Sequence, residues 1–403
     1  MSEPKRGPLS GVTVIELCHV MAGPTCGLML ADMGADVIKV EKIPGGDDTR
    51  RSVPPDIAGE AAAFMMMNRN KRGIAVDLKT AGGKRVLRRL LETADVVTEN
   101  YRRGTLAKLG FAYDDLKRAN PGLIYAAISG FGLTGPYADR GGFDLVAQGM
   151  SGLMSITGEG PDRPPVKVGA PVTDITAGIL LAFGIVAAYV HRLKTGEGQM
   201  VDTSLFEAGI THTYWQSAIA FATGIAPRAM GSAHPLNAPY QAVRTADGYI
   251  NIGAANDKNW LRMLDAIGAA HLGEDPRFAR NSDRMANLAA LIEALETVFA
   301  TRPSAAWLDL LEQAGVPAGP ILDVAKMHAD PQVIARDMVP TVEHPIAGAV
   351  QTIGLPIKFS ETPGAVTAPS PLYGQHTREV LRQFGFDEAE IDALAQEKAI
   401  AVG

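Results

Sequence analysis

Short apolar runs of strand length alternate with helical segments through the first 130 residues of the chain. The strand-like runs are VTVIEL (12–17), ADVIKVE (35–41), GIAVDL (73–78), DVVTEN (95–100) and LIYAAIS (123–129). Between them lie segments such as GKRVLRRLLETA (83–94), with apolar residues at helical spacing and basic residues on the other face. Such alternation is typical of βαβ units, which build a parallel sheet with helices on both faces. The sequence therefore predicts an α/β fold with a Rossmann-like domain.

The pattern changes after residue 200. Helical text over 205–224 precedes a stretch rich in Gly and Pro, and two strand-like runs then flank Ala246-Asp247-Gly248, a hairpin signal. With 403 residues the chain exceeds what one core normally holds, so we expect two domains. The predicted organisation is a large Rossmann-like domain from 1–205 and 330–403, a smaller α+β domain over 225–325, and linkers at 206–224 and 326–329.

Composition narrows the possible partners. A net charge of −6 gives no general attraction to nucleic acid or to an anionic membrane, so we expect neither as a partner. The eight histidines lack metal-site spacing, and no metal is predicted. Cys18 and Cys26 are either reduced core residues or one bridge, and such sparse use of cysteine favours a reducing compartment. The start, MSEPKRGPLSG, lacks the apolar stretch of a signal peptide, so the expected location is the cytoplasm.

One carboxylate, Asp174, precedes the most apolar run of the chain. The uncharged run from Ala177 to Val190 stops at His191, too short for the ~20 residues that cross a bilayer, and it predicts a helix buried in a large protein. Asp is a favoured N-cap residue, so a capping role is the simplest interpretation of Asp174. A carboxylate where a helix meets an apolar interior is alternatively kept for chemistry. The local sequence leaves both open.

The string GFGLTG (130–135) satisfies the GxGxxG pattern and follows a predicted strand. A dinucleotide fingerprint also needs a helix that opens on these glycines. Pro136 and the segment 139–142 interrupt such a helix. The pattern predicts a tight turn near a ligand rather than a nicotinamide or flavin site.

Basic residues gather where the predicted strands end. They are Lys39 and Lys42, Arg50 and Arg51, the run Asn68-Arg69-Asn70-Lys71-Arg72, and then Arg102, Arg103 and Lys108. Each group alone fits a solvated charged face. Together they follow the strands of a parallel sheet, whose ligands bind beyond the carboxyl ends of the strands. This arrangement suits a polyanionic nucleotide.

Several strings, in order along the chain, resemble the class III CoA-transferase family, of the formyl-CoA transferase and carnitine CoA-transferase (CaiB/BaiF) type. They are HVMAGPTCGLMLADMGADVIKVEK (19–42), NRNKRGIAVDL (68–78), VTENYRRGTLAKLGF (97–111), SGFGLTGP (129–136), TDITAGILLAFGIVAAY (173–189) and GLPIKFSETP (354–363). The resemblance implies a Rossmann-like large domain, a small domain reached through linkers, and an interlocked homodimer. It also implies that CoA is a substrate and carrier, with no tightly bound cofactor.

The nucleophilic aspartate of that family falls at Asp174. A CoA-transferase must conserve thioester energy while it exchanges carboxylates, and an ionised carboxylate shielded from water can do so through an anhydride and an enzyme thioester. The resemblance also implies which residues bind CoA: His19, Val20 and Ala22 along the pantetheine, Lys42 near the adenine, and Asn70, Lys71, Arg72, Asn100, Tyr101 and Lys108 around the nucleotide and its phosphates.

The related α-methylacyl-CoA racemases are the alternative. They use a histidine in a Gly-His-Asp string, where this chain has Gly142-Phe143-Asp144, and an acid that is matched here by Asn256. No base for racemisation is evident, so transfer is favoured. Formyl-CoA transferases have a glutamine where this chain has Met21, and a glycine-rich loop that is missing from GSAHPLNAPY (231–240). The strings are more similar to enzymes that move CoA from succinyl-CoA to small dicarboxylic acids.

Overall fold

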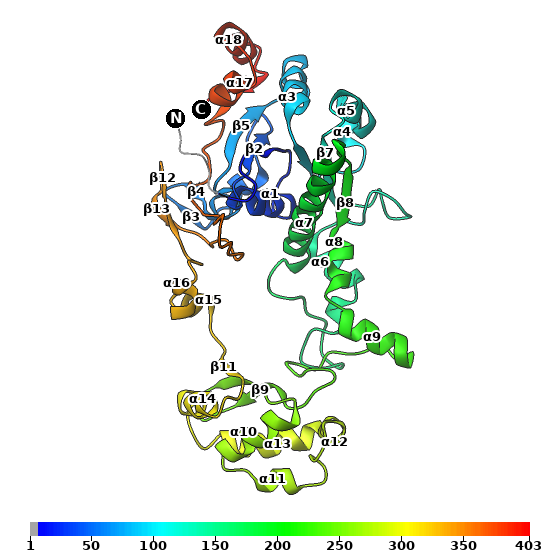
Figure 1. The fold of residues 1–403 in the computed structure, drawn as a ribbon, viewed down its shortest axis with the longest axis vertical. Helices are drawn as coiled ribbons and strands as arrows, with labels where there is room; N and C mark the ends of the chain where they lie inside the picture. The colour runs from blue at the N-terminus through cyan, green and yellow to red at the C-terminus, as the bar shows by residue number, and fades with distance from the viewer. Residues whose placement is uncertain (1–6) are drawn as a thin grey trace. The chain divides into compact units, whose positions relative to one another are not determined.

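The predicted parallel sheet is present in the computed structural model, which describes residues 7–403. Seven strands lie in the order β14-β5-β2-β1-β6-β7-β8, and every neighbouring pair is parallel except β14 with β5 (Figure 1). Their bounds are β1 Thr13–Glu16, β2 Asp36–Glu41, β5 Arg72–Val76, β6 Val96–Glu99, β7 Ile124–Ser129, β8 Met200–Ser204 and β14 Ile400–Ala401. After β1 the chain adds β2 and β5 on one side of it, and it then crosses to add β6, β7 and β8 on the other side. Doubly wound sheets bind ligands at this switch point, between β1 and β6.

Helices cover both faces of this sheet, because successive strand residues point to opposite sides. In β1, Ile15 belongs to one apolar core and Val14 to the other. Leu87 and Leu90 of α3 fill the first core, whereas Leu30 of α1 belongs to the second. The helices of this part of the chain are α1 Ala22–Asp32, α2 Ala62–Asn68, α3 Ala81–Thr93, α4 Thr105–Leu109, α5 Tyr113–Ala119, α6 Asp144–Met150, α7 Val172–Thr195, α8 Leu205–Thr211, α16 Pro331–Ala335, α17 Thr377–Gln383 and α18 Glu388–Gln396, with a 3-10 turn η1 at Asp48–Arg51.

Helix α7 is longer than the apolar run predicted, at 24 residues. Within residues 7–403 it is the one helix long and apolar enough to cross a membrane by length and composition. Its Leu181 and Ile185 are buried in the core shared with α1 and the sheet. One face of α7 therefore packs in the protein interior, while Phe183 and Leu193 on the same helix are exposed.

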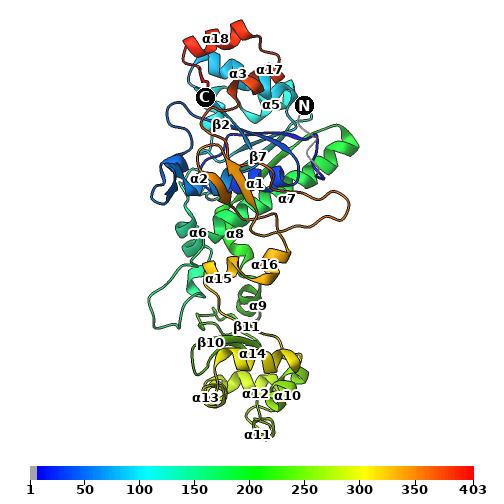
Figure 2. The same cartoon turned by 90° about the vertical axis from the view of Figure 1, so that its left-hand side faces the viewer.

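The chain end returns to the sheet. Strand β14 pairs with β5, with Ile400 opposite Val76. Helices α17 and α18 lie near α3 and contribute to the same core (Figures 1 and 2). The first unit also contains two small antiparallel hairpins: β3 Asp56–Ile57 with β4 Glu60–Ala61, and β12 Thr341–His344 with β13 Gly348–Gln351. Residues 1–6, which contribute to the prediction that the chain has no signal peptide, lie outside the described residues.

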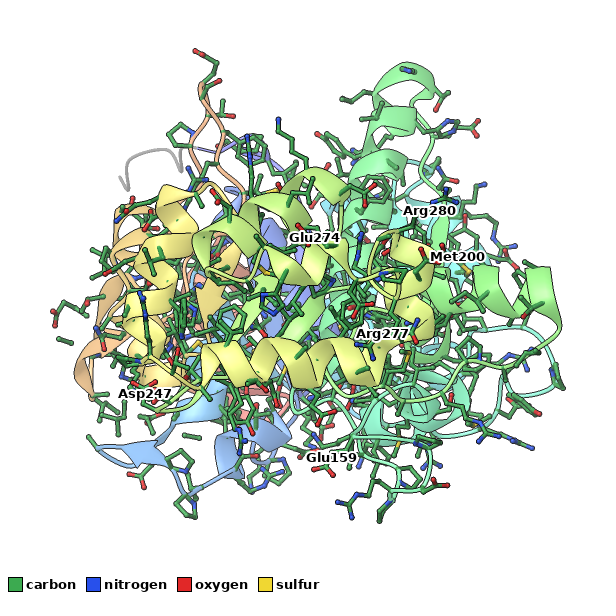
Figure 3. All side chains as sticks on the ribbon, turned by 90° about the horizontal axis from the view of Figure 1, so that it is seen from below. Glu159, Met200, Asp247, Glu274, Arg277 and Arg280 are labelled. Atoms are coloured by element: carbon green, nitrogen blue, oxygen red, sulfur yellow. The ribbon has the colours of Figure 1, made fainter. Side chains whose placement is uncertain are left out.

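The second unit is built on a three-stranded antiparallel sheet in the order β11-β10-β9. The predicted hairpin is confirmed, because Tyr249 of β10 pairs with Arg244 of β9. Trp260, Phe299 and Trp307 are buried in its core. Figure 3 labels Glu274, Arg277 and Arg280 among its side chains. Its elements are η2 Leu153–Ser155, α9 Tyr214–Thr223, β9 Tyr240–Arg244, β10 Tyr249–Gly253, α10 Asp257–Ala266, α11 His271–Glu274, α12 Asn281–Ala286, α13 Leu288–Phe299, α14 Ser304–Gln313, β11 Ala318–Pro320 and α15 Val324–His328.

The division of the chain differs in part from the prediction. Among the described residues, the first unit comprises 7–152, 168–212 and 331–403, and the second comprises 153–167 and 213–330. Residues 153–167 were predicted to lie in the large domain, but the amide of Gly231 donates to the carbonyl of Gly158 at 2.8 Å, which joins this segment to the second unit. The local sequence of 153–167 carries no sign of that distant partner.

Candidate active site

Two loops meet at the carboxyl ends of β1 and β6, where the order of the sheet reverses. The amide of His19 donates to Oδ1 of Asn100 at 2.9 Å, and Nδ2 of Asn100 donates to the carbonyl of His19 at 2.8 Å. The His19 ring lies 3.3 Å from the hydroxyl of Tyr101 through Nε2, while its Nδ1 is buried and has no hydrogen-bond partner within residues 7–403. Reciprocal bonds of this kind hold the two loops in one arrangement.

Val20, the next residue, has a left-handed backbone with φ 68°. This region is costly for a β-branched residue, and such strain is found mostly at functional sites. The amide of Val20 donates to both carboxylate oxygens of Asp47, at 3.2 and 3.3 Å. Asp47 in turn pairs with Lys39 at 2.9 Å, and Lys39 donates to the carbonyl of Cys18. A buried ion pair therefore fixes the loop after β1. Sequence reasoning missed Asp47, since its partners lie on other elements.

A cavity of about 240 Å³ collects several of the predicted residues around Asp174. Four of the predicted CoA-binding residues share this cavity with the carboxylate. It is lined by His19, Val20, Met21, Ala22, Asn100, Ile128, Ser129, Gly130, Gly142, Phe143, Asp174 and Leu205. The structure thus brings the first loop and the candidate nucleophile into one space.

Asp174 stands in the first turn of α7, but it does not cap the helix. The N-cap position is Pro171, which provides no side-chain hydrogen bond. Asp144 supplies the cap instead, since its Oδ1 accepts from the amide of Thr173 at 3.0 Å and from the Thr173 hydroxyl at 2.8 Å. The capping interpretation of Asp174 is therefore wrong in this structure, and its carboxylate forms no hydrogen bond with any side chain or amide of residues 7–403.

The surroundings of Asp174 change its acidity. Burial, and then the negative charge of Asp144, raise the pKa of Asp174 to about 6. The N-terminus of α7 acts in the opposite sense, because a helix N-terminus stabilises an anion. At neutral pH the carboxylate is mostly ionised, partly desolvated and free of competing hydrogen bonds, which are the properties of a nucleophile.

The glycines of GFGLTG form the predicted tight turn beside this cavity. Gly132 and Gly135 have positive φ values of 90° and 84°, and a Cβ on Gly130 would come within 2.6 Å of the Cα of Gly142. The next helix, α6, begins only at Asp144. No helix opens on the glycines, so the string is not a dinucleotide fingerprint.

A second, larger cavity of about 480 Å³ adjoins the same loops, within the usual range for small-molecule sites. His19 lines both cavities. Predicted Lys42, Tyr101 and Lys108 line the larger one, together with Lys79, which the sequence analysis missed although it follows the predicted strand 73–78. Six of the other lining residues are apolar, namely Val40, Ile43, Pro44, Val76, Leu78 and Leu109, and three are polar, namely Glu41, Asp77 and Thr105. Three lysines around apolar walls suit a flat ring system joined to phosphates.

The run Asn68-Arg69-Asn70-Lys71-Arg72 lies elsewhere. Lys71 is buried, with Nζ 2.9 Å from Oε2 of Glu16 and donating to the carbonyl of Pro24. Burial lowers the pKa of Lys71 in spite of the Glu16 charge. Asn70 is also buried and donates to Asp32 at 2.7 Å.

Arg72 pairs with Asp36 and Glu379. None of the three predicted residues Asn70, Lys71 and Arg72 lines either cavity. Their side chains are engaged inside the large unit, and the structure brings none of them to either cavity.

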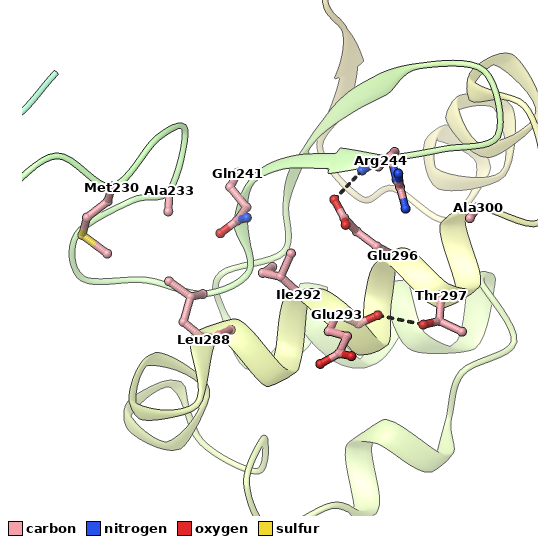
Figure 4. Close-up of a pocket in the computed structure, with 11 residues that line it drawn as sticks. Met230, Ala233, Gln241, Arg244, Leu288, Ile292, Glu293, Glu296, Thr297 and Ala300 are labelled. Atoms are coloured by element: carbon pink, nitrogen blue, oxygen red, sulfur yellow. Dashed lines mark hydrogen bonds between the residues drawn. The ribbon is translucent and has the colours of Figure 1, made fainter. Parts of the chain in front are cut away.

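The remaining features do not add to this site. Cys18 and Cys26 are both free and buried, so the alternative of a bridge is wrong. Within the described residues no group of three His, Cys, Asp or Glu side chains could hold a metal ion. A separate cavity of about 590 Å³ in the second unit contains none of the predicted residues; there Glu296 accepts from the amide of Arg244 (Figure 4).

The fold and site define a class: a doubly wound α/β enzyme in which a nucleotide-sized cavity and a smaller cavity that holds a carboxylate share His19 in their walls. Comparison with known proteins gives the family. The family model described as CoA-transferase family III matches residues 9–377, and the chain belongs to this family.

Relatives and a solved structure agree with this assignment. The chain is 43% identical to succinate–glutarate CoA-transferase of Agrobacterium fabrum over 94% of this chain and 96% of that one. It is 36% identical to succinyl-CoA:glutarate CoA-transferase of Mus musculus over 96% of this chain and 89% of that one. It is 39% identical to acetyl-CoA:oxalate CoA-transferase of Acetobacter aceti over 96% of this chain and 98% of that one. A CaiB/BaiF family protein from Brucella suis is 42% identical, with a TM-score of 0.84 over 94% of this chain and 100% of that one.

Proposed function

We propose that this enzyme moves CoA from succinyl-CoA to a small dicarboxylic acid through a thioester on Asp174. The observation that carries the proposal is the partly buried carboxylate of Asp174 in a cavity that shares His19 with the nucleotide-sized cavity. The names of the relatives from Agrobacterium fabrum and Mus musculus support the donor and the acceptor class.

The reaction is a chain of acyl transfers. A carboxylate oxygen of Asp174 attacks the thioester carbonyl of succinyl-CoA, the C–S bond breaks, and CoA leaves as a thiolate, so that a mixed anhydride forms. The thiolate attacks the aspartyl carbonyl, which releases succinate and leaves the enzyme–CoA thioester. The acceptor carboxylate attacks that thioester, and the returning thiolate then takes the acyl group from the new anhydride and restores Asp174. No water enters, and thioester energy is conserved.

The two cavities match the two ends of CoA. The adenine nucleotide fits the larger cavity, where Lys42, Lys79 and Lys108 offer positive charge, and the pantetheine passes His19 toward the smaller one. Lys42 is partly engaged, because its Nζ lies 2.7 Å from Asp48. The positions of Asn70, Lys71 and Arg72 support a structural role for these residues rather than contact with CoA.

Racemisation, the alternative, gains no support from the site. Phe143 is 78% exposed at the position where the racemases have their histidine. Asn256 caps α10, since its side chain accepts from the amide of Asn259 at 2.8 Å. Neither can move a proton from the α-carbon. Deuterium exchange at the α-carbon in heavy water without an acceptor would favour the racemase instead.

We also propose an interlocked homodimer. Large apolar side chains are exposed within each unit, which is unusual for a monomer when they are contiguous. In the first unit Phe183 and Leu193 of α7 are 73% and 70% exposed, and in the second Phe221 of α9 is 89% exposed. Light scattering at micromolar concentration tests this, and a stable 42.6 kDa species would contradict it.

We propose a cytoplasmic location, with which the free, buried Cys18 and Cys26 are consistent.

The decisive assay for the acceptor is CoA transfer from succinyl-CoA to a panel of acids. Glutarate, other small dicarboxylates, oxalate and formate belong in the panel, because one relative is named for oxalate. Transfer to dicarboxylates of intermediate length is expected. Turnover with formate alone would contradict the proposed acceptor class while leaving the mechanism intact.

A further inference from the structure

The basic run 68–72, which the CoA site does not use, contributes to a small cavity of about 70 Å³ within the first unit. The cavity lies among α2, the β12–β13 hairpin and the segment 369–370. Its volume is several times the about 10–15 Å³ that one water needs. Apolar side chains of Ile57, Met65, Val342 and Val350 form part of its wall.

Three buried polar atoms without a hydrogen-bond partner in residues 7–403 belong to residues that line this cavity. They are Nε of Arg69, Nε2 of His344 and Oγ of Ser370. These residues are 3%, 3% and 2% exposed, so bulk water does not satisfy the three atoms. A buried polar atom without a partner is costly, and three around one cavity point to a bound species.

All three groups can donate a hydrogen bond. The other guanidinium nitrogens of Arg69 are engaged, Nη2 with Asp32 at 2.6 Å and Nη1 with Thr352 at 3.3 Å, which leaves the Nε hydrogen. Nδ1 of His344 accepts from the amides of Ile346 and Ala347 at 3.3 and 3.1 Å, so the proton of the neutral ring is on Nε2. The hydroxyl of Ser370 rotates freely. The cavity therefore presents donors and apolar walls.

We propose that this cavity binds a small monovalent anion of the chloride class. An anion accepts from Arg69, His344 and Ser370 together, whereas water would also need acceptors for its own protons. The hydroxyl of Thr352, which also lines the cavity, already accepts from Arg69 and donates to the sulfur of Met66. Arg69, whose Nη2 pairs with Asp32 at 2.6 Å, brings a cationic donor to the wall of the cavity. The bound anion ties α2 to the β12–β13 hairpin and to Ser370.

Bromide, which gives an anomalous diffraction signal, is the direct probe. Crystals of the wild-type enzyme soaked in sodium bromide should show one anomalous peak within hydrogen-bonding distance of Arg69 Nε, His344 Nε2 and Ser370 Oγ. Density for water alone at the highest bromide concentration would overturn the proposal.

Thermal unfolding supplies the test in solution. In sodium chloride the midpoint should exceed that in sodium gluconate of equal ionic strength, because an ion that binds only the native state stabilises it. The excess should disappear in Ser370→Ala and persist in Ser360→Ala, a matched change at an exposed serine. An equal excess in both variants would refute the site. The bromide measurement needs no variant, so it decides the question even if Ser370→Ala does not fold.

Discussion

Lys39→Met should destabilise the protein strongly, since Lys39 is fully buried in a set of charges beneath the loop after β1. Its Nζ lies 3.1 Å from Oε1 of Glu16 and 2.9 Å from Oδ2 of Asp47, and it donates to the carbonyl of Cys18 at 2.9 Å. Burial alone would lower the pKa of Lys39, but Glu16 and Asp47 outweigh it and raise that pKa above its ordinary value. Removing one partner of a buried pair costs about 3–5 kcal/mol.

The structure places the expected loss near the lower end, about 3 kcal/mol, because one carboxylate and not two is left unpaired. Glu16 keeps Lys71 at 2.9 Å, whereas Asp47 retains only hydrogen bonds from Val20 and Thr49. Urea unfolding at pH 7 measures the change. The matched control is Lys42→Met, whose pair with Asp48 is about half exposed and contributes at most about 1 kcal/mol.

The pH dependence gives a second measure of the same loss. Burial works to raise the pKa of Asp47, but the charge of Lys39 and hydrogen bonds from Lys39 and Thr49 hold it below its ordinary value. In the wild type this stabilisation is present above the unfolded pKa of about 3.9 and is lost as the pH falls through the lower folded pKa. In Lys39→Met, burial without the lysine should raise the pKa of Asp47, so protonation of Asp47 at lower pH removes the unpaired buried charge and its cost to stability. The difference in stability should shrink from pH 7 toward about pH 4. A loss no larger than that of Lys42→Met would refute the reasoning.

Three further predictions concern the site. The pKa of Asp174 is raised to about 6, and its ionised form is the proposed nucleophile. The value of kcat/KM should therefore fall as the pH drops below about 6. A kcat/KM that is constant from about pH 5 to 7 would contradict this prediction. Lys108→Ala should weaken the binding of CoA more than the binding of pantetheine, and the difference should fade as salt is added. Equal losses of affinity for both ligands would show that Lys108 does not contact the nucleotide. Lys71→Ala should instead lower the midpoint of unfolding, because Lys71 is paired with Glu16. Gly178→Ala should cost about 1–3 kcal/mol in urea unfolding, since its Cβ would lie 2.5 Å from the carbonyl of Ala22, and a neutral result would show that α1 and α7 yield.

The strands and the position of the site could be predicted because they depend on local patterns. Alternation of apolar runs with amphipathic segments indicated β1, β2, β5, β6 and β7, and the loops that follow such strands meet at one edge of the sheet. His19, Asn100 and Tyr101 lie at that edge for this reason.

The side-chain contacts that could not be predicted from the sequence depend on partners far away in the chain. Lys71 and Lys108 look alike as basic residues near strand ends, but Lys71 finds Glu16 on β1 and turns inward, while Lys108 stays exposed. Asp174 has the sequence context of a cap, yet Asp144, thirty residues earlier, makes the capping bonds. Side-chain direction at such positions is decided by packing and not by the local string.

The most direct test of the central claim is the covalent state of Asp174. Native enzyme incubated with succinyl-CoA and no acceptor, then treated with hydroxylamine, should carry a hydroxamate on the peptide that contains Asp174, detected by mass spectrometry. Asp174→Asn should remain folded and bind CoA, because the cap of α7 comes from Asp144, but it should neither transfer CoA nor become labelled. Label on another peptide, or full transfer by Asp174→Asn with deamidation excluded by mass, would contradict the account.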